Sequence, residues 1–361
     1  MRTAIAAILI VITCIFPTSP ATAIEPVDWM VELRLDGRSI EGTPLAWDAR
    51  VVHLLGRDGR LWQFPPRKAA DFRKTSDRFR CYTVSELRAV LLRELGRDFE
   101  VSGTTHYLVA HPAGERDKWA ERFENLYRSF VQYFSVRGFR TAPPPFPLIG
   151  VVCRDRGDFA RYCARQGLPN TSGVLGFYAR DSNRIVLYDM SAEDSRSWQQ
   201  NASVIIHEAT HQTAFNTGIH SRYVQPPLWV VEGLATMFEA PGVYDSQHYK
   251  HRADRINRDR LEAFRQLVAP RHKPELLSAI VASDEAFRTD TAAAYAEAWA
   301  LSFYLVETQP RKYTHYLART ADRPAFSRYT AAERVADFVA VFGDDWQMLE
   351  ARFLRFVEDL P

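Results

Sequence analysis

Two histidines one helical turn apart, inside an apolar segment, constrain this chain more than any other feature. Near the start of the segment Val204–Ala240 lies the pentapeptide His207-Glu208-Ala209-Thr210-His211, an H-E-x-x-H pattern. Because an α-helix turns once every 3.6 residues, His207 and His211 project from the same helix face. Two imidazoles at that spacing can bind one Zn²⁺, and Glu208 beside them can accept a proton from water. The pattern therefore predicts a helix that carries part of a metal site.

A third ligand is available in a second apolar segment. A catalytic zinc site takes three protein ligands and keeps one position open. Glu232 follows His211 by 21 residues and lies in a predicted helix, Leu228–Glu239, which begins after Pro226-Pro227. A turn at Gly218 makes the two helices antiparallel, so the Glu232 carboxylate can reach the two histidines. One alternative is a metal-free core, which leaves a buried acid without a partner at high cost. The other is a structural zinc site, for which no fourth Cys or His ligand is near.

The first 23 residues have the pattern of a secretory signal peptide. Arg2 provides a positive charge, Ala4–Phe16 is apolar, and Ala21-Thr22-Ala23 is a small-residue cleavage site. The apolar stretch is shorter than the roughly 20 residues that span a bilayer. Thr13 is a poor fit before an acylated Cys14, so cleavage is favoured over lipoprotein anchoring. We expect export to the periplasm or the extracellular space, with no stable membrane insertion after cleavage.

Composition and cysteine content narrow the function classes. The 361-residue chain has a formal net charge of +2, which argues against a nucleic-acid partner. With 46% hydrophobic residues it can bury a large core in two or three units. Three cysteines follow the signal segment: Cys81, Cys153 and Cys163. Cys153 and Cys163 can form a disulfide in an oxidising compartment or remain buried thiols.

The periodicity predicts an α+β protein in three parts after the signal peptide. Residues 24–100 form a β-rich module with one helix, with strands at Val31–Leu35, Val51–Leu55 and Leu61–Phe64 and a helix at Ser85–Leu95. Residues 101–240 form a mixed unit, with strands at Thr105–Ala110, Leu148–Cys153, Gly173–Tyr178 and Arg184–Tyr188 and helices at Glu115–Phe134, Asp158–Gln166, Trp198–Asn216 and Leu228–Glu239. Residues 241–361 are helical, at Asp254–Val268, Ala292–Thr308, Ala331–Phe342 and Trp346–Leu360.

The two motif segments together resemble the gluzincin metallopeptidases. The H-E-x-x-H of His207–His211 is followed by Trp229-Val230-Val231-Glu232-Gly233-Leu234-Ala235, a W-x-x-E-G-x-A pattern. The pairing is similar in particular to the peptidase MA-like proteins, which include uncharacterised secreted bacterial families. The resemblance covers about residues 104–310. It implies a zincin-like catalytic domain, in which a mixed sheet with an edge strand and an active-site helix precede a helical subdomain.

The resemblance also implies roles for individual residues. His207, His211 and Glu232 bind Zn²⁺, and Glu208 is the general base. An acid seven residues after the ligand glutamate, here Glu239, shares its helix face and can accept the other N–H of a ligand histidine. The alternative for Glu239 is a surface acid at a helix end.

A tyrosine on a later helix completes the site in the aminopeptidase N relatives. Tyr295 lies 63 residues after Glu232, a similar distance, and its phenol can donate to the developing oxyanion. Tyr304 and Tyr313 compete for this role, and core packing is the alternative for all three.

One departure from the aminopeptidase pattern bears on specificity. Those enzymes have a Gly-x-Met-x-Asn segment upstream, with an acid that holds the substrate amino terminus. The corresponding residues Gly173, Val174, Leu175 and Gly176 contain neither an acid nor an amide. We expect them to form an edge strand that pairs with an extended peptide through backbone hydrogen bonds. Endopeptidase activity is therefore favoured over exopeptidase activity.

The leading hypothesis is a secreted or periplasmic zinc-dependent metallopeptidase that acts on a peptide or protein substrate. One alternative is a non-peptidase binding or assembly module of the cell envelope that keeps the zincin fold. The intact Glu208 argues against it, because binding alone does not need a base. A zinc hydrolase of small amides or esters is the second alternative.

Overall fold

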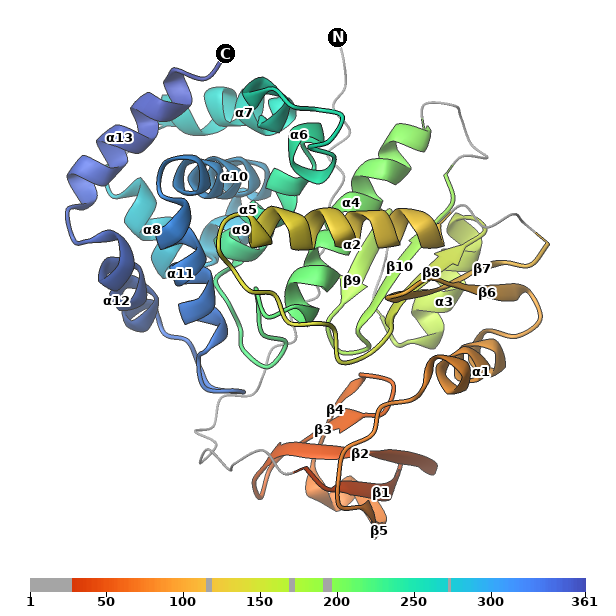
Figure 1. The fold of residues 1–361 in the computed structure, drawn as a ribbon. Coiled ribbons are helices and arrows are strands. Elements are labelled where there is room, and N and C mark those ends of the chain that lie inside the picture. Colours follow the sequence, from red (N-terminus) through yellow and green to blue (C-terminus); the bar gives the residue numbers. More distant parts are fainter. Residues whose placement is uncertain (1–27, 115–118, 169–172, 191–196, 272–273) are drawn as a thin grey trace.

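The computed structural model describes residues 28–114, 119–168, 173–190, 197–271 and 274–361 (Figure 1). The predicted signal peptide lies outside the described residues. Two five-stranded sheets and many helices make up the fold, so the protein has a mixed α+β architecture. No helix among the described residues is long and apolar enough to cross a membrane.

The first sheet is an antiparallel module at the N-terminal end. Its strands are β1 (Met30–Leu35), β2 (Arg38–Trp47), β3 (Val52–Gly56), β4 (Leu61–Phe64) and β5 (Ala69–Ser76) in the order β4-β3-β2-β1-β5. The three strands predicted from sequence are β1, β3 and β4, whereas β2 and β5 were not predicted. Gly59 in the β3–β4 turn has φ +82°, a conformation that favours glycine. Alternate residues of these strands, including Val31, Leu33 and Leu54, form a small core.

The second sheet carries the parts that position the site. Its strands are β6 (Phe99–Gly103), β7 (Tyr107–Pro112), β8 (Leu148–Cys153), β9 (Gly176–Ala179) and β10 (Arg184–Tyr188) in the order β6-β7-β8-β10-β9. The three central strands are parallel, and the outer two are antiparallel to their neighbours. β9 is therefore an edge strand.

Helices cover both faces of this second sheet. On one face lie α2 (Ala120–Ser135) and α4 (Ser197–Asn216), and on the other lie α1 (Val84–Leu95) and α3 (Arg156–Arg165) (Figure 1). Alternate strand residues point to the two layers: Val152 packs toward α2 and α4, whereas Val151 packs toward α1 and α3. Burial on both sides explains why β7, β8 and β10 read as continuous apolar runs in the sequence.

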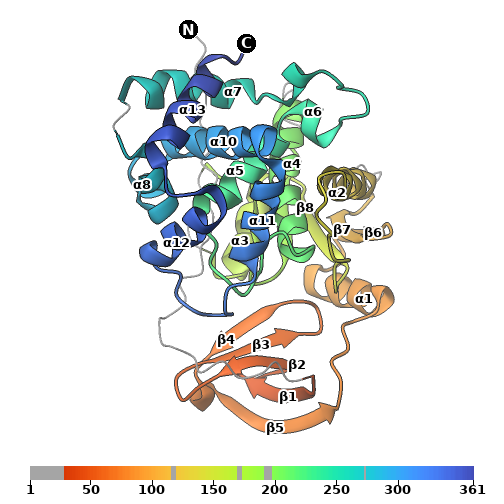
Figure 2. The same cartoon turned by 60° about the vertical axis from the view of Figure 1, so that its left-hand side comes forward.

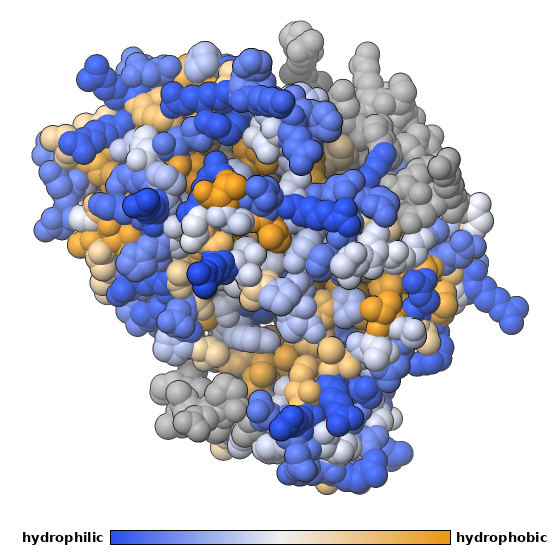
Figure 3. Space-filling model, viewed as in Figure 1, coloured by the Kyte–Doolittle hydropathy of each residue, from blue (hydrophilic) through white to orange (hydrophobic). Residues whose placement is uncertain are grey.

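The module boundary predicted near residue 100 stays a prediction, although α1 is informative about it. The sequence groups α1 with the N-terminal strands, yet Leu87 and Leu91 of α1 pack in the core of the second sheet. The first sheet meets the rest of the chain at a seam where the His53 ring stacks on Phe326 at 3.8 Å. Hydrophobic side chains gather along this seam on an otherwise mainly hydrophilic face (Figure 3).

The C-terminal part is helical and packs around one long helix. It comprises α5 (Leu228–Phe238), α6 (Pro241–Tyr244), α7 (Arg258–Ala263), α8 (Leu276–Ala282), α9 (Glu285–Thr289), α10 (Thr291–Thr308), α11 (Pro310–Ala321), α12 (Ala331–Phe342) and α13 (Trp346–Glu358) (Figure 2). α10 lies against α5, and Gly233 allows their close approach, because a Cβ there would lie 2.4 Å from the carbonyl oxygen of Ala298. α11 was not predicted.

The single helix predicted at Asp254–Val268 is wrong. Asn257 has φ −74° and ψ 100°, outside the helical region, and its side chain accepts a hydrogen bond from the N–H of Arg260. It is thus the N-cap of α7, which turns into a π-helical segment at Phe264–Val268. The sequence prediction missed this N-cap because the arginine-rich pattern is typical of one continuous helix.

Candidate metal centre

Two antiparallel helices bring the three predicted ligands together in the core. α4 carries His207 and His211, and α5 carries Glu232. The Nε2 atoms of the two histidines are 3.0 Å apart. Oε2 of Glu232 lies 3.3 Å from Nε2 of His207 and 3.5 Å from Nε2 of His211. All three side chains are buried, and these residues are the one such candidate metal-binding group among the described residues.

These separations fit a tetrahedral metal ion. Ligand atoms about 2.0–2.1 Å from a zinc ion at tetrahedral angles lie about 3.3 Å from one another. The three observed separations fall on either side of that value. Glu232 is 0% exposed, and neither of its carboxylate oxygens makes a hydrogen bond of good geometry to a described residue. Since a buried carboxylate is costly without a partner, the donor set is suited to a cation.

Glu239 fixes the orientation of His207. Its Oε1 atom lies 2.8 Å from Nδ1 of His207, so Nδ1 donates and Nε2 is left with its lone pair toward the other ligands. Nδ2 of Asn257 donates to Oε2 of Glu239 at 2.8 Å, and the guanidinium of Arg260 lies 3.8 Å from Oε1. Burial lowers the pKa of His207, but the nearby carboxylate of Glu232 and the hydrogen bond to Glu239 outweigh it and raise that pKa above its ordinary value. Glu239 therefore lies where it can orient His207, and its role at a metal site stays a prediction.

Glu208 is held by the edge strand. The backbone N–H of Tyr178, in β9, donates to Oε2 of Glu208 at 2.6 Å. Glu208 is 2% exposed. Burial raises its pKa above the ordinary carboxyl value, while the neighbouring charges of His207 and His211 oppose that rise. A buried carboxylate with a raised pKa is suited to accepting and returning a proton near neutral pH.

Tyr295 is the tyrosine that the structure places beside this cluster. Its pKa lies well above the ordinary phenol value because of burial and then the nearby carboxylate charges of Glu232 and Glu208. The guanidinium of Arg260 lies 5.3 Å from the centre of its ring. The two competitors lie elsewhere. Tyr304 packs on Phe353 and Phe356, and Tyr313, in α11, is fully buried in the helical core.

The predicted substrate strand requires a correction. An edge strand does run beside α4, but it is β9, which begins at Gly176. Gly173, Val174 and Leu175 precede it, and Gly173 has φ +83°, which is incompatible with an extended strand. A backbone role for the edge strand stays a prediction for β9 alone.

The sequence did not point to three residues that support the centre. Tyr178 acts through its backbone, which leaves no trace in a side-chain pattern. Asn257 and Arg260 reach Glu239 from a helix whose start was misassigned. Of the sulfur groups, Cys153 and Cys163 are buried free thiols and Cys81 is a partly exposed one, so the structure corresponds to the thiol alternative.

Comparisons with known proteins found one family model that matches part of the chain and one structural likeness. A family model described as a protein of unknown function, DUF1570, matches residues 201–327, which include both ligand helices. No curated protein matches the chain. Among 31 matching chains of solved structures is a mutant of an M1 zinc metallopeptidase from Deinococcus radiodurans, with 14% identity and a TM-score of 0.41. The match covers 72% of this chain and 50% of that one, so this protein spans half its length. A likeness of this degree carries no argument about activity.

Proposed function

We propose that this protein is an exported zinc-dependent metallopeptidase that cleaves within peptide or protein chains. The observation that supports it most is the spacing of the Nε2 atoms of His207 and His211 and Oε2 of Glu232, with Glu208 on the same helix. Two histidines that only pack in a core would not need the carboxylates of both Glu232 and Glu208 beside them. Three ligands leave a fourth tetrahedral position for water or substrate.

Metal binding and proton transfer divide among four side chains and one backbone group. His207, His211 and Glu232 would hold a Zn²⁺, which when bound would supply a Lewis acid for the scissile carbonyl and lower the pKa of water. Glu208 takes the proton of the attacking water and passes it to the leaving amine. The N–H of Tyr178 keeps the Glu208 carboxylate in place.

Charge develops on the carbonyl oxygen during this attack. Tyr295 carries its proton throughout, because its pKa is raised, and its hydroxyl can donate to that oxygen. Glu239 meanwhile holds the ring of His207 by its Nδ1–H group.

Endopeptidase activity is proposed because the stretch before and within β9 has no acid to hold a substrate amino terminus. A peptide library with free and with acetylated amino termini tests this. We expect cleavage of both, lost on chelation and restored by zinc. Cleavage of free peptides alone, one residue from the amino terminus, would overturn the endopeptidase proposal. Export is tested by amino-terminal sequencing of the mature protein, which we expect to begin at Ile24.

A further inference from the structure

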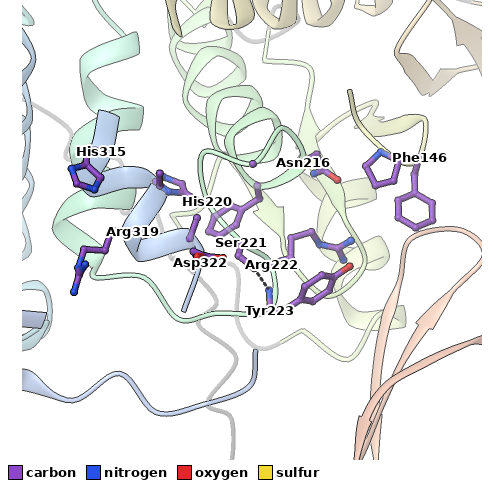
Figure 4. Close-up of a pocket in the computed structure, with 14 residues that line it drawn as sticks. Phe146, Asn216, His220, Ser221, Arg222, Tyr223, His315, Arg319 and Asp322 are labelled. Atoms are coloured by element: carbon purple, nitrogen blue, oxygen red, sulfur yellow. Dashed lines mark hydrogen bonds between the residues drawn. The ribbon is translucent and has the colours of Figure 1, made fainter. Parts of the chain in front are cut away.

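A cavity of about 700 Å³ opens beyond the C-terminal end of α4 (Figure 4). Its wall combines the last turn of α4, the loop that follows it, and the end of α11. Figure 4 shows His220 on the side of the α11 side chains His315 and Arg319, whereas Arg222 lies beyond Ser221, beside Tyr223. None of the metal-centre residues lines it, so it is a separate feature of the chain.

The cavity nevertheless begins close to the metal centre. Phe215 lines it and follows His211 by four residues, so both lie on one face of α4. The ring of Phe215 stacks on Tyr178 of β9 at 5.9 Å between centres, and the guanidinium of Arg180 lies 4.5 Å from its centre. Arg180 directly follows β9. A peptide that pairs with β9 across the centre therefore extends toward this cavity.

His220 is a buried polar side chain on this wall whose ring makes no hydrogen bond of good geometry to a described residue. It is 1% exposed. Its backbone N–H donates to the carbonyl oxygen of Ala214, which ends α4 and fixes the position of the residue. Burial first, and then the charges of His211 and Arg180, lower its pKa to about 3. The neutral ring thus keeps one N–H donor and one acceptor nitrogen.

Arg222 is a buried cation on the same wall. It is 5% exposed, and its side chain donates only to backbone carbonyl oxygens, those of Arg180 at 2.6 and 3.1 Å and of Asp181 at 3.3 Å. Among the described residues it forms no ion pair. The other arginine of the wall, Arg319, has its charge balanced by Asp337. Since buried charges are normally paired, the guanidinium of Arg222 favours an incoming anion.

We propose that this cavity is a substrate subsite that binds a peptide carboxylate, with Arg222 providing the charge and His220 a hydrogen bond. The inference rests on the proposed peptidase function. An Asp or Glu side chain and a C-terminal carboxylate offer the same chemistry. Both extend from a peptide that lies along β9.

Matched peptides test the proposal and separate the two sources. One pair places Glu or Gln at each position around the cleaved bond, and a second pair has a free or an amidated C-terminus. In at least one of the two pairs, we expect wild type to show a higher kcat/KM for the peptide with the carboxylate than for its uncharged partner. Arg222→Gln and His220→Phe should each reduce that preference by about tenfold to a hundredfold, the value of a hydrogen bond to a charged group. Arg222→Lys should retain part of it, and the exposed Arg165→Gln should leave it unchanged.

Several outcomes would overturn the subsite. It is overturned if wild type cleaves all members equally well, or if the variants lose activity on Glu and Gln peptides in equal proportion, as a loosened loop would cause. Urea unfolding of each variant shows whether it still folds, and His220→Gln serves as the milder change if His220→Phe does not fold.

If no peptide is cleaved at all, the peptidase function fails and the subsite is tested by binding alone. Titration with N-acetylglutamate and with N-acetylglutamine amide, which carries no carboxylate, then measures it directly. Binding of the first only, lost in Arg222→Gln, supports the carboxylate site. Equal binding of both, or none, overturns it.

Discussion

Replacing Glu239 by alanine removes the acceptor that holds His207 in its metal-binding orientation. The 2.8 Å bond between Nδ1 of His207 and Oε1 of Glu239 is charge-assisted and largely buried. Loss of such a partner to a ligand histidine weakens metal binding by about 10-fold to 100-fold, or roughly 1.4–2.7 kcal/mol. Glu239→Gln keeps an acceptor oxygen but not its charge, so we expect a smaller loss, about fivefold to tenfold.

The assay is a zinc titration against a chromophoric chelator of known affinity. Glu358→Gln, an exposed acid on α13, is the matched control for the change in net charge, and it should bind zinc as wild type does. The reasoning is refuted if Glu239→Ala, shown by circular dichroism to be folded, has the zinc affinity of wild type. Equal losses in the alanine and glutamine variants would instead show that charge alone matters.

Three further changes probe the surrounding structure. Tyr295→Phe should lower kcat by about 10²–10³-fold with zinc content retained, as measured by steady-state kinetics and metal analysis; an unchanged kcat would remove Tyr295 from the mechanism. Burial and the nearby charge of Glu350 raise the pKa of Glu297, which is 6% exposed, to about 8. The native state therefore keeps a proton that the unfolded state loses above about pH 4.5, so stability falls as pH rises from about 4.5 to 8. Glu297→Gln should gain up to roughly 4–5 kcal/mol relative to wild type across that window in urea unfolding, and a pH-independent difference would contradict the assignment. Gly233→Ala should cost about 1–3 kcal/mol of unfolding free energy, because its Cβ meets the Ala298 carbonyl, and a neutral effect would show that α5 and α10 can separate freely.

The candidate metal ligands could be predicted from sequence because the two helices that carry them have local signals. His207 and His211 are related by one helical turn, and the Leu228–Phe238 helix has a clear start at Pro227. The strands Leu148–Cys153 and Arg184–Tyr188 were predicted with their observed bounds, since burial on both faces gives them an unbroken apolar pattern.

The parts that were missed depend on contacts between distant segments. The Tyr178–Glu208 bond joins positions 30 residues apart through a backbone group. Asn257 and Arg260 reach the centre only because the chain breaks at a cap within an otherwise helical pattern. Arg222 can be recognised as a candidate anion-binding residue only when its burial and its backbone acceptors are known. Neither follows from its place in the sequence.

Zinc content and peptide cleavage, measured side by side for wild type and Glu208→Gln, test the central claim most directly. Glu208 is not one of the three ligands, so both proteins should bind one zinc ion per chain. Wild type should cleave peptides, and the variant should do so at least about 100-fold more slowly. Wild type without bound zinc, or a variant that cleaves as fast as wild type, would contradict the proposed function.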